Sequence, residues 1–416
     1  MKNKKNLKER GITLIALVVT IVVLLILAGV TINAVFSDSG IIKKAQEAQN
    51  KANESVQKDM EQINALENWL NENTGESNND KEVNISTLVG KEAVTKNTKA
   101  VDAYENKITI PKGFKVLAHN PTSSTGAVTY TYSGDNIPAV QDGIVIEDKD
   151  GNQFVWVPVG EIKNKDNTTN TITLGRYEFD SSTGALTSTT PVQVASVENC
   201  MQEVTISTNY KELSTLREGN TAEDSTAENA TARDLKTFVE TSLENGGYYI
   251  ARYEASGTTK IISKYNQEVL VDITQPTAAK LAREMYGEVK EDDELVYASD
   301  LVNSYAWDTA IIFIQTYSTE TDASSYASEN KSTSFANTGI NNDKYCNIWD
   351  MSGNAYEWTT EYSTRSSLIY FYSCVYRGGC YYAPNDEAGD YASNRNSAFT
   401  TGSLSFCGLR LLIYVK

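Results

Sequence analysis

The sequence predicts an α+β fold behind an N-terminal hydrophobic helix, and three observations predict it. A run without charged residues extends from Gly11 to Phe36. From residue 105 onward, short runs of β-branched and aromatic residues lie between turn residues, which is typical of strands. Between these runs, apolar residues recur at helical spacing and are bounded by capping residues. About 300 residues are enough for one sizeable core.

The hydrophobic run predicts a membrane-spanning helix. Its roughly 25 residues, at about 1.5 Å each, cover about 38 Å and are long enough to cross a bilayer. Basic residues crowd its N-terminal side and hold that end in the cytoplasm; they are Lys2, Lys4, Lys5, Lys8 and Arg10. We therefore expect an envelope protein, single-pass or pilus-associated, whose C-terminal domain lies outside the cell.

The junction before this helix resembles the type IV prepilin signal, because the charges stop at Gly11 and Ile12 follows. The resemblance covers the leader and the helix only. It implies cleavage after Gly11, a methylated Ile12 and pilin-like subunits as partners. Pilins usually carry a glutamate at the fifth mature position, where this chain has Ala16, which favours a tip or minor subunit. An uncleaved membrane anchor is the alternative.

The chain divides into four predicted regions. Residues 1–11 are the leader, and residues 12–70 are the transmembrane and stalk helix. The stalk part is predicted to be an amphipathic helix, because Ile63, Leu66 and Leu70 form an apolar stripe among charged residues. Residues 71–104 begin with Asn, Glu, Ser and Gly and predict a linker. Residues 105–416 are the folded domain.

Strands and helices alternate in the predicted domain. Strands are expected at 108–110, 114–116, 154–159 and 248–254, and Asp150-Gly151 is a hairpin turn. One helix begins near Leu235 and ends before Gly246. A second is bounded by Thr274 as N-cap and Gly287 at its end, and a third passes through Ala306–Ile314.

The stretch Asn347–Thr359 contains a tight turn and the start of a strand. Gly353 tolerates positive φ, and Tyr356 and Trp358 fall on one face of the strand, opposite to Glu357.

Oxygen donors converge on this turn, and a hard cation such as calcium takes oxygen ligands. The candidate ligands are the carboxylates of Asp350 and Glu357 and the carbonyls of Gly353 and Ala355. The alternative is that Asp350 only caps the turn and that Glu357 pairs with Arg377 in the core.

Three islands resemble the formylglycine-generating-enzyme, or sulfatase-modifying-factor, domain, a variant of the C-type lectin fold. They are Asn347–Thr359, Arg377-Gly378-Gly379 and Gly408-Leu409-Arg410, in this order. Similar stretches upstream, at 154–159, 246–254 and 304–308, extend the resemblance over most of the chain after residue 105. In that family the calcium loop uses the positions that match Asp350, Gly353, Ala355 and Glu357.

The catalytic groups of the family are missing. Its oxidase branch binds copper with two cysteines that follow Arg-Gly-Gly, and the matching positions here are Ala383 and Ala388. Another branch binds iron through a histidine triad, but His119 is the only histidine in the sequence. We therefore expect no catalytic residues, no copper and no iron, and a binding domain rather than an enzyme.

The five cysteines show no zinc spacing, and their odd number leaves at least one thiol unpaired. Cys374, Cys380 and Cys407 share the last segment, where a pair would form a disulfide in an oxidising compartment. An atypical thiol oxidase that uses one of these three is the enzymatic alternative. Such an enzyme would lose activity on Cys380→Ser, whereas a binding domain would keep its ligand.

The segment from Tyr381 to Phe406 is rich in Tyr, Ser, Asn and Asp, the mixture found in antibody paratopes. The residues predicted to contact a ligand are Tyr381, Tyr382, Asn385, Asp386, Asp390, Tyr391, Asn394, Arg395 and Asn396. The alternative is that this segment forms ordinary irregular surface without a ligand. In lectin-fold proteins diversified by retroelements, the variable segment lies at this position, so the resemblance implies a diversified binding segment.

The net charge of −17 argues against nucleic acid as a partner. We expect the membrane, pilin-like subunits and an extracellular protein or glycan ligand as partners, and Ca²⁺ as the cofactor. The predicted function is adhesion or ligand binding by a non-catalytic lectin-fold head. A structural minor pseudopilin of a secretion or DNA-uptake machine is the alternative.

Overall fold

The computed structural model describes residues 51, 82–117, 138–206, 210–212, 232–318, 334–341, 344–364, 373–381, 391–399 and 402–416. All of these except Lys51 belong to one compact unit, Asp80–Lys416. The predicted leader with Gly11 and Ile12, and the predicted membrane helix, lie outside the described residues. Within the described ranges, no helix is both long and apolar enough to cross a membrane.

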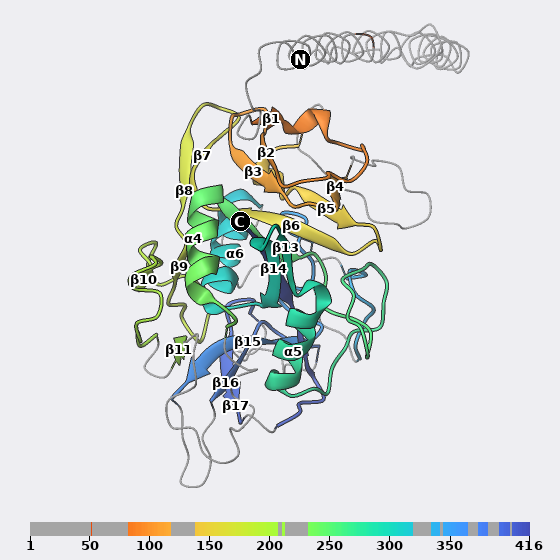
Figure 1. The fold of residues 1–416 in the computed structure, drawn as a ribbon. Coiled ribbons are helices and arrows are strands. Elements are labelled where there is room, and N and C mark those ends of the chain that lie inside the picture. Colours follow the sequence, from red (N-terminus) through yellow and green to blue (C-terminus); the bar gives the residue numbers. More distant parts are fainter. Residues whose placement is uncertain are drawn as a thin grey trace, which may run out of the picture. The chain divides into compact units, whose positions relative to one another are not determined.

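A seven-stranded antiparallel sheet forms the centre of the domain, in the order β13-β14-β19-β12-β6-β5-β4 (Figure 1). Strand β12 is buried along its whole length and pairs with β6 on one side and β19 on the other. The strands are β4 (Phe114–Val116), β5 (Val145–Asp148), β6 (Gln153–Pro158), β12 (Gly247–Ala251), β13 (Glu288–Glu291), β14 (Glu294–Leu301) and β19 (Leu411–Val415).

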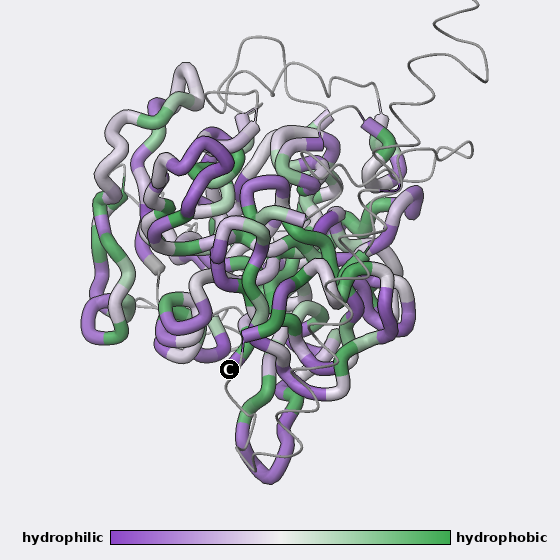
Figure 2. Tube along the Cα trace, turned by 90° about the horizontal axis from the view of Figure 1, so that it is seen from above, coloured by the Kyte–Doolittle hydropathy of each residue, from purple (hydrophilic) through white to green (hydrophobic). Residues whose placement is uncertain are grey.

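Both faces of this sheet are covered by helices. Alternate residues of β6 enter two different apolar clusters: Phe154 and Trp156 pack with α5 (Gln275–Tyr286) in one, and Val155 and Val157 pack with α4 (Leu235–Asn245) and α6 (Ser304–Tyr317) in the other. This alternation follows from the period of two in a strand. Figure 2 shows apolar residues gathered inside the trace and hydrophilic residues at its edges.

A second sheet lies at the far end of the unit from β1–β3 (Figure 1). Its order is β11-β15-β16-β17, and β18 pairs with β15 in parallel. Its strands are β11 (Tyr210–Glu212), β15 (Tyr356–Ser363), β16 (Cys374–Arg377), β17 (Arg395–Ala398) and β18 (Cys407–Leu409).

Short strands and turns complete the described part. They are β1 (Val83–Asn84), β2 (Thr98–Val101) and β3 (Lys107–Ile110), the pair β7 (Gly160–Lys163) and β8 (Thr169–Ile172), the pair β9 (Gly175–Arg176) and β10 (Gln193–Val194), and the 3-10 turns η1 (Ile85–Thr87) and η2 (Val140–Asp142). Strands β1 and β2 fall inside the range 71–104 that the sequence assigns to a linker. The residues from Glu82 onward therefore belong to the folded domain.

The three helices predicted within the domain are confirmed: α4 and α5 have their predicted ends, whereas α6 extends beyond 306–314 and covers Ser304–Tyr317. The Thr274 side chain accepts a hydrogen bond from the Thr277 amide at the start of α5, and Gly246 ends α4 with a φ of 74°. The predicted hairpin at Asp150-Gly151 joins β5 to β6. Strand β12 ends at Ala251, three residues before the predicted end at Glu254.

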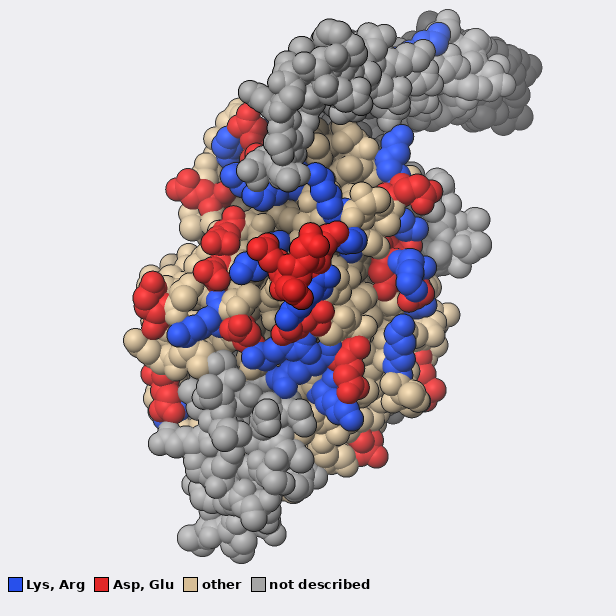
Figure 3. Space-filling view, viewed as in Figure 1, with Lys and Arg blue, Asp and Glu red and all other residues tan. Residues whose placement is uncertain are grey.

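Charged side chains of both signs are interspersed over the face drawn in Figure 3, where Lys and Arg lie among Asp and Glu.

We predict that Gly143→Ala unfolds the domain far more readily than Gly113→Ala. Both glycines have a φ near the left-handed region, +77° and +86°, so each alanine carries a conformational cost of about 1 kcal/mol. A Cβ at Gly143 would lie 1.9 Å from the carbonyl oxygen of Cys346, whereas a Cβ at Gly113 has no atom within 4 Å.

Urea denaturation of the two variants measures this difference. Gly143→Ala should lose more than about 3 kcal/mol of unfolding free energy, because backbone must move. Equal losses in the two variants would contradict the close approach of η2 to the Cys346 loop.

Candidate functional site

A buried ion network joins the C-terminal segment to the core. The Arg377 guanidinium of β16 lies 2.6 Å from an Asp308 oxygen of α6, and neither side chain is exposed. Arg395 of β17 pairs with the other Asp308 oxygen at 3.0 Å and with Glu361 of β15 at 2.9 Å, and is only 6% exposed. Arg176 of β9 completes the network through Glu361 at 3.1 Å.

The network has three guanidinium groups and two carboxylates, so opposite charges compensate most of the cost of burial. Burial lowers the pKa of Arg377, as does Arg395 nearby, while Asp308 and Glu361 oppose this effect. The loss of one partner from a buried ion pair typically costs about 3–5 kcal/mol, because the other charge stays buried. The network therefore fixes β16 and β17 against α6 and β15.

A second buried pair joins the start of β15, which follows the turn at Asp350, to the residue before the last strand. Both oxygens of Glu357 face Arg410, at 2.7 Å from Nη2 and 3.0 Å from Nε. Arg410 also donates to the carbonyls of Ala251 and Trp349, each at 2.8 Å. The alternative pairing of Glu357 with Arg377 is wrong: the two residues are opposite in the β15–β16 register, but the Arg377 side chain turns to Asp308.

Two more carboxyl groups lie near this pair. Asp350, with a φ of 56°, accepts a hydrogen bond from the Gly339 amide at 2.8 Å. Glu254 accepts one from the Ala355 amide at 2.9 Å and another from the Asn354 side chain. All three carboxyl groups are buried.

Of these three buried carboxyl groups, Glu357 pairs with Arg410, while Glu254 and Asp350 interact with Arg410 through their charge. Burial raises the pKa of Glu254 well above its usual range, and the negative charges of Asp350 and Glu357 raise it further. Burial also raises the pKa of Glu357 to about 7, although Arg410 opposes the shift. The cluster therefore has a surplus of negative charge that protons or a bound cation would offset.

The predicted calcium ligands fit calcium in their chemistry, because all of them are oxygen donors and the surrounding charge is negative. Among the described residues, no group of three or more His, Cys, Asp or Glu is arranged to hold a metal. A cation at this turn would therefore be coordinated by the carbonyls of Gly353 and Ala355 together with Asp350. Glu357 would contact both the cation and Arg410, with which it pairs. The calcium site stays a prediction.

Five of the nine predicted ligand-contact residues lie in the described part of the chain. Tyr381 is half-buried with its ring centre 4.4 Å from that of Phe335, and the Tyr391 hydroxyl donates to the Ser182 carbonyl at 3.1 Å. Asn394 and Asn396 are half-buried, whereas Arg395 points into the ion network. The other four, which are Tyr382, Asn385, Asp386 and Asp390, lie outside the described residues.

The residues that sequence reasoning missed are the buried acids Glu254, Asp308 and Glu361. Glu254 and Asp308 follow stretches rich in aromatic residues, and charged residues in such stretches are rarely buried without a partner; Glu361 follows Thr359-Thr360 and has no such signal. That pattern is the only signal that the sequence offers for Glu254 and Asp308. Asp308 and Glu361 pair with arginines of β9, β16 and β17, and Glu254 accepts from the Asn354 side chain and the Ala355 amide, so these contacts could not be predicted from local sequence.

All five cysteines are described, and none forms a disulfide. Cys374, Cys380 and Cys407 are buried. Burial, reinforced by Glu357, raises the pKa of the Cys407 thiol above its usual range. A neutral thiol is a poor nucleophile and a poor metal ligand, because the thiolate is the reactive form.

The central sheet, the helices on its faces and the β15–β18 sheet at one end define a β-rich, C-type lectin-like domain. The chain belongs to the family of the sulfatase-modifying factor enzyme 1-like domain, whose model matches residues 145–415. This match confirms the family that the three sequence islands predict.

Several solved structures are similar to this chain at low identity. PvdO from Pseudomonas aeruginosa is 13% identical, over 66% of this chain and 98% of that chain, with a TM-score of 0.35. Treponema denticola variable protein 1 is 12% identical over 64% of this chain and 96% of that chain, with a TM-score of 0.26. The Major Tropism Determinant U1 variant is 12% identical over 81% of this chain and 99% of that chain, with a TM-score of 0.29. No curated protein matches the chain.

We predict that the domain becomes more stable as the pH falls from about 7.5 to about 5.5 in the presence of a chelator. The pKa of Glu357 is about 7 in the folded state and 4.5 ordinarily. Between these values the folded state binds a proton that the unfolded state does not. The unfolding free energy therefore rises as the pH falls through this window.

Urea denaturation of Glu357→Gln at several pH values isolates this contribution. Its stability should change less with pH than that of the wild type, while Glu240→Gln, an exposed position on α4, should follow the wild type. Identical slopes for the wild type and Glu357→Gln would contradict the raised pKa.

Proposed function

We propose that this domain is a non-catalytic ligand-binding head that acts in adhesion at the cell surface. In this proposal the N-terminal segment anchors the protein in the membrane or joins it to a pilus. The C-terminal segment, including residues 391–399, contacts an extracellular protein or glycan. Its sequence diversification is part of the proposal, and a nearby template copy that differs at adenines is the DNA evidence it requires.

The observation that carries the proposal is how residues 391–399 are held. Three contacts hold this segment against the core. Arg395 pairs with Asp308 in the ion network, and Arg377 Nε donates to the Asn394 carbonyl at 2.9 Å. The Ser393 hydroxyl donates to the Gly184 carbonyl at 2.8 Å. Asn394 and Asn396 stay half-buried, and Phe399 is 39% exposed.

A polar surface on a rigid base lowers the entropy that is lost on binding. Paratopes combine rigid aromatic anchors with adaptable polar groups in the same way. The segment therefore has the composition and the support that recognition needs.

The residues present favour binding over oxidase chemistry. Ala383 and Ala388 stand where the oxidase branch of the family has its copper-binding thiols. Cys380 is buried, and the Cys407 thiol is held neutral. The enzymatic alternative would need an unfamiliar arrangement of these buried thiols.

We predict that binding depends on the half-buried Asn396 and the exposed Phe399 of this segment. The probe is a printed array of bacterial and host glycans and of extracellular-matrix proteins. Truncation of a contact at the centre of an interface typically costs more than about 1 kcal/mol. Asn396→Ala and Phe399→Ala should therefore weaken the array signal by about tenfold at a temperature at which both variants are folded.

The matched control is Val194→Ala, because Val194 is an apolar side chain that is 50% exposed on β10, outside the segment. This variant should bind like the wild type. No array signal for the wild type would favour the pseudopilin alternative, in which the head serves assembly. Oxygen consumption with a thiol peptide, lost in Cys380→Ser, would favour the oxidase.

We also propose that Ca²⁺ binds at Asp350, Gly353, Ala355 and Glu357 and stiffens the turn beside this surface. The support is the surplus negative charge of the buried carboxyl cluster. Calcium should then raise the melting temperature of the wild type relative to a chelator, because a ligand of the folded state stabilises it. Asp350→Asn should lose this increase.

The control is Asp300→Asn, which alters a buried carboxylate that pairs with Arg283 at 2.9 Å. It should lower the melting temperature equally with calcium and with chelator. If Asp350→Asn behaves in the same way, the calcium proposal is refuted.

A further inference from the structure

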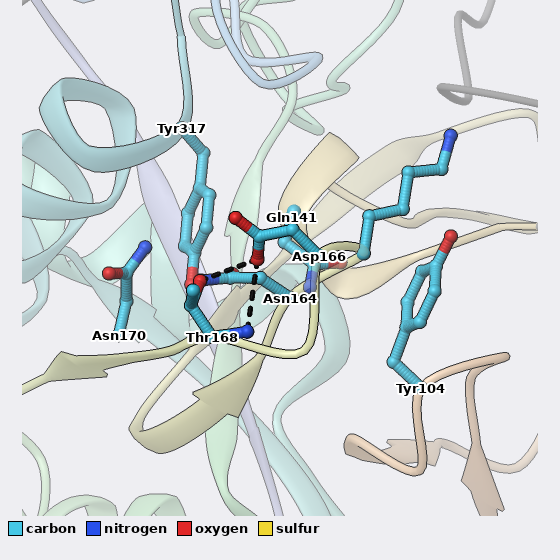
Figure 4. Close-up of a pocket in the computed structure, with 8 residues that line it drawn as sticks. Tyr104, Gln141, Asn164, Asp166, Thr168, Asn170 and Tyr317 are labelled. Atoms are coloured by element: carbon cyan, nitrogen blue, oxygen red, sulfur yellow. Dashed lines mark hydrogen bonds between the residues drawn. The ribbon is translucent and has the colours of Figure 1, made fainter.

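A polar pocket of about 450 Å³ opens beside the β7–β8 hairpin (Figure 4). This volume is typical of small-molecule sites. The hairpin lies at the opposite end of the unit from β17 in Figure 1, so the pocket is separate from the C-terminal segment. Its lining includes Tyr104, Gln141, Asn164, Asp166, Thr168 and Tyr317.

The Gln141 side chain presents an unsatisfied acceptor. Its Nε2 donates to the Lys163 carbonyl at 2.5 Å, which sets the orientation of the amide. Its Oε1 is buried and has no hydrogen-bond partner within the described part of the chain.

Asn164 presents a second unsatisfied acceptor, and its orientation is also set. Its Nδ2 donates to the Thr168 hydroxyl at 2.9 Å, and that hydroxyl donates to Asp166 at 2.6 Å. Asp166 also accepts from the Thr168 amide at 3.0 Å. This chain of bonds, drawn in part in Figure 4, leaves Asn164 Oδ1 buried without a donor among the described residues.

The Tyr317 hydroxyl is the third buried polar atom at this pocket that has no well-directed partner in the described chain. Burial raises the pKa of Tyr317 to about 12, although the Asn170 side chain beside it opposes the shift. The hydroxyl is therefore protonated at neutral pH and able to donate or accept. Figure 4 shows the rings of Tyr317 and Tyr104 on opposite sides of the polar group.

These atoms define what a ligand must offer. An unsatisfied buried polar group costs about 1–3 kcal/mol, so a ligand that satisfies several of them gains affinity. The two amide oxygens need hydroxyl or N–H donors, and they would repel a phosphate. The charges of Lys165 and Asp166 cancel, and Asp166 is already engaged by Thr168, so the lining does not favour a free cation either.

We propose that this pocket binds a neutral saccharide unit of one or two rings. Sugar hydroxyls supply the missing donors to Gln141 and Asn164 and accept from Tyr317, and the tyrosine rings offer apolar faces to the C–H faces of a sugar. The proposal does not rest on the function proposed for the C-terminal segment.

The test is ligand-observed NMR of the full-length chain with the methyl glycosides of glucose, galactose, mannose, N-acetylglucosamine and N-acetylgalactosamine. At least one should bind, and Tyr317→Phe and Gln141→Leu should each weaken it by about tenfold. Tyr317→Phe should leave the melting temperature nearly unchanged, because its hydroxyl has no well-directed partner among the described residues, whereas Gln141→Leu also removes the Nε2 bond to the Lys163 carbonyl and should lower the melting temperature slightly. Asn396→Ala should leave glycoside binding unchanged.

The matched control is Tyr286→Phe, which removes a hydroxyl that donates to Asp148 at 2.7 Å. It should lower the melting temperature by a few degrees and leave glycoside binding unchanged. Two outcomes overturn the proposal. One is that no glycoside binds. The other is that Tyr317→Phe lowers the melting temperature like the control and leaves binding intact, which would make its hydroxyl structural.

Discussion

The arrangement of this domain depends on the buried carboxylate of Asp308. It comes from α6, the helix at the centre of one apolar cluster, and it holds Arg377 at 2.6 Å and Arg395 at 3.0 Å. These arginines belong to β16, which precedes the segment predicted to contact a ligand, and to β17, which lies within it. Because charges in an apolar core must be compensated, the positions of both strands are set by one side chain of the core.

A second buried pair acts on the end of the chain. Arg410 directly precedes β19, and its contacts with Glu357 and with the carbonyls of Ala251 and Trp349 join the last strand to β12 and to the turn at Asp350. The two ion systems differ in sign: the Asp308 network has more guanidinium groups than carboxylates, whereas the Arg410 cluster has more carboxyl groups. The first holds the strands of the segment in place, and in the second the raised pKa values of Glu254 and Glu357 make the cluster sensitive to protons.

Much of the fold could be predicted because its signals are local. Thr274, Gly246 and the Asp150-Gly151 turn mark boundaries through backbone chemistry that acts over a few residues. The family could be predicted from three short islands. The side-chain pairs could not, since Asp308 meets Arg377 across 69 positions and Gln141 meets the Lys163 carbonyl across 22. Such contacts depend on the tertiary fold, and the pairing of Glu357 with Arg377, an alternative that the spacing allowed, does not form.

The most direct test of this account is amide hydrogen exchange of β17 in the wild type and in Asp308→Asn, with β12 as the internal reference. If the buried carboxylate holds the segment, protection of Arg395–Ala398 should fall by about tenfold or more while that of β12 changes little. Equal changes in both strands would mean that Asp308 stabilises the whole domain without a special role for the segment. Unchanged protection in β17 would contradict the account.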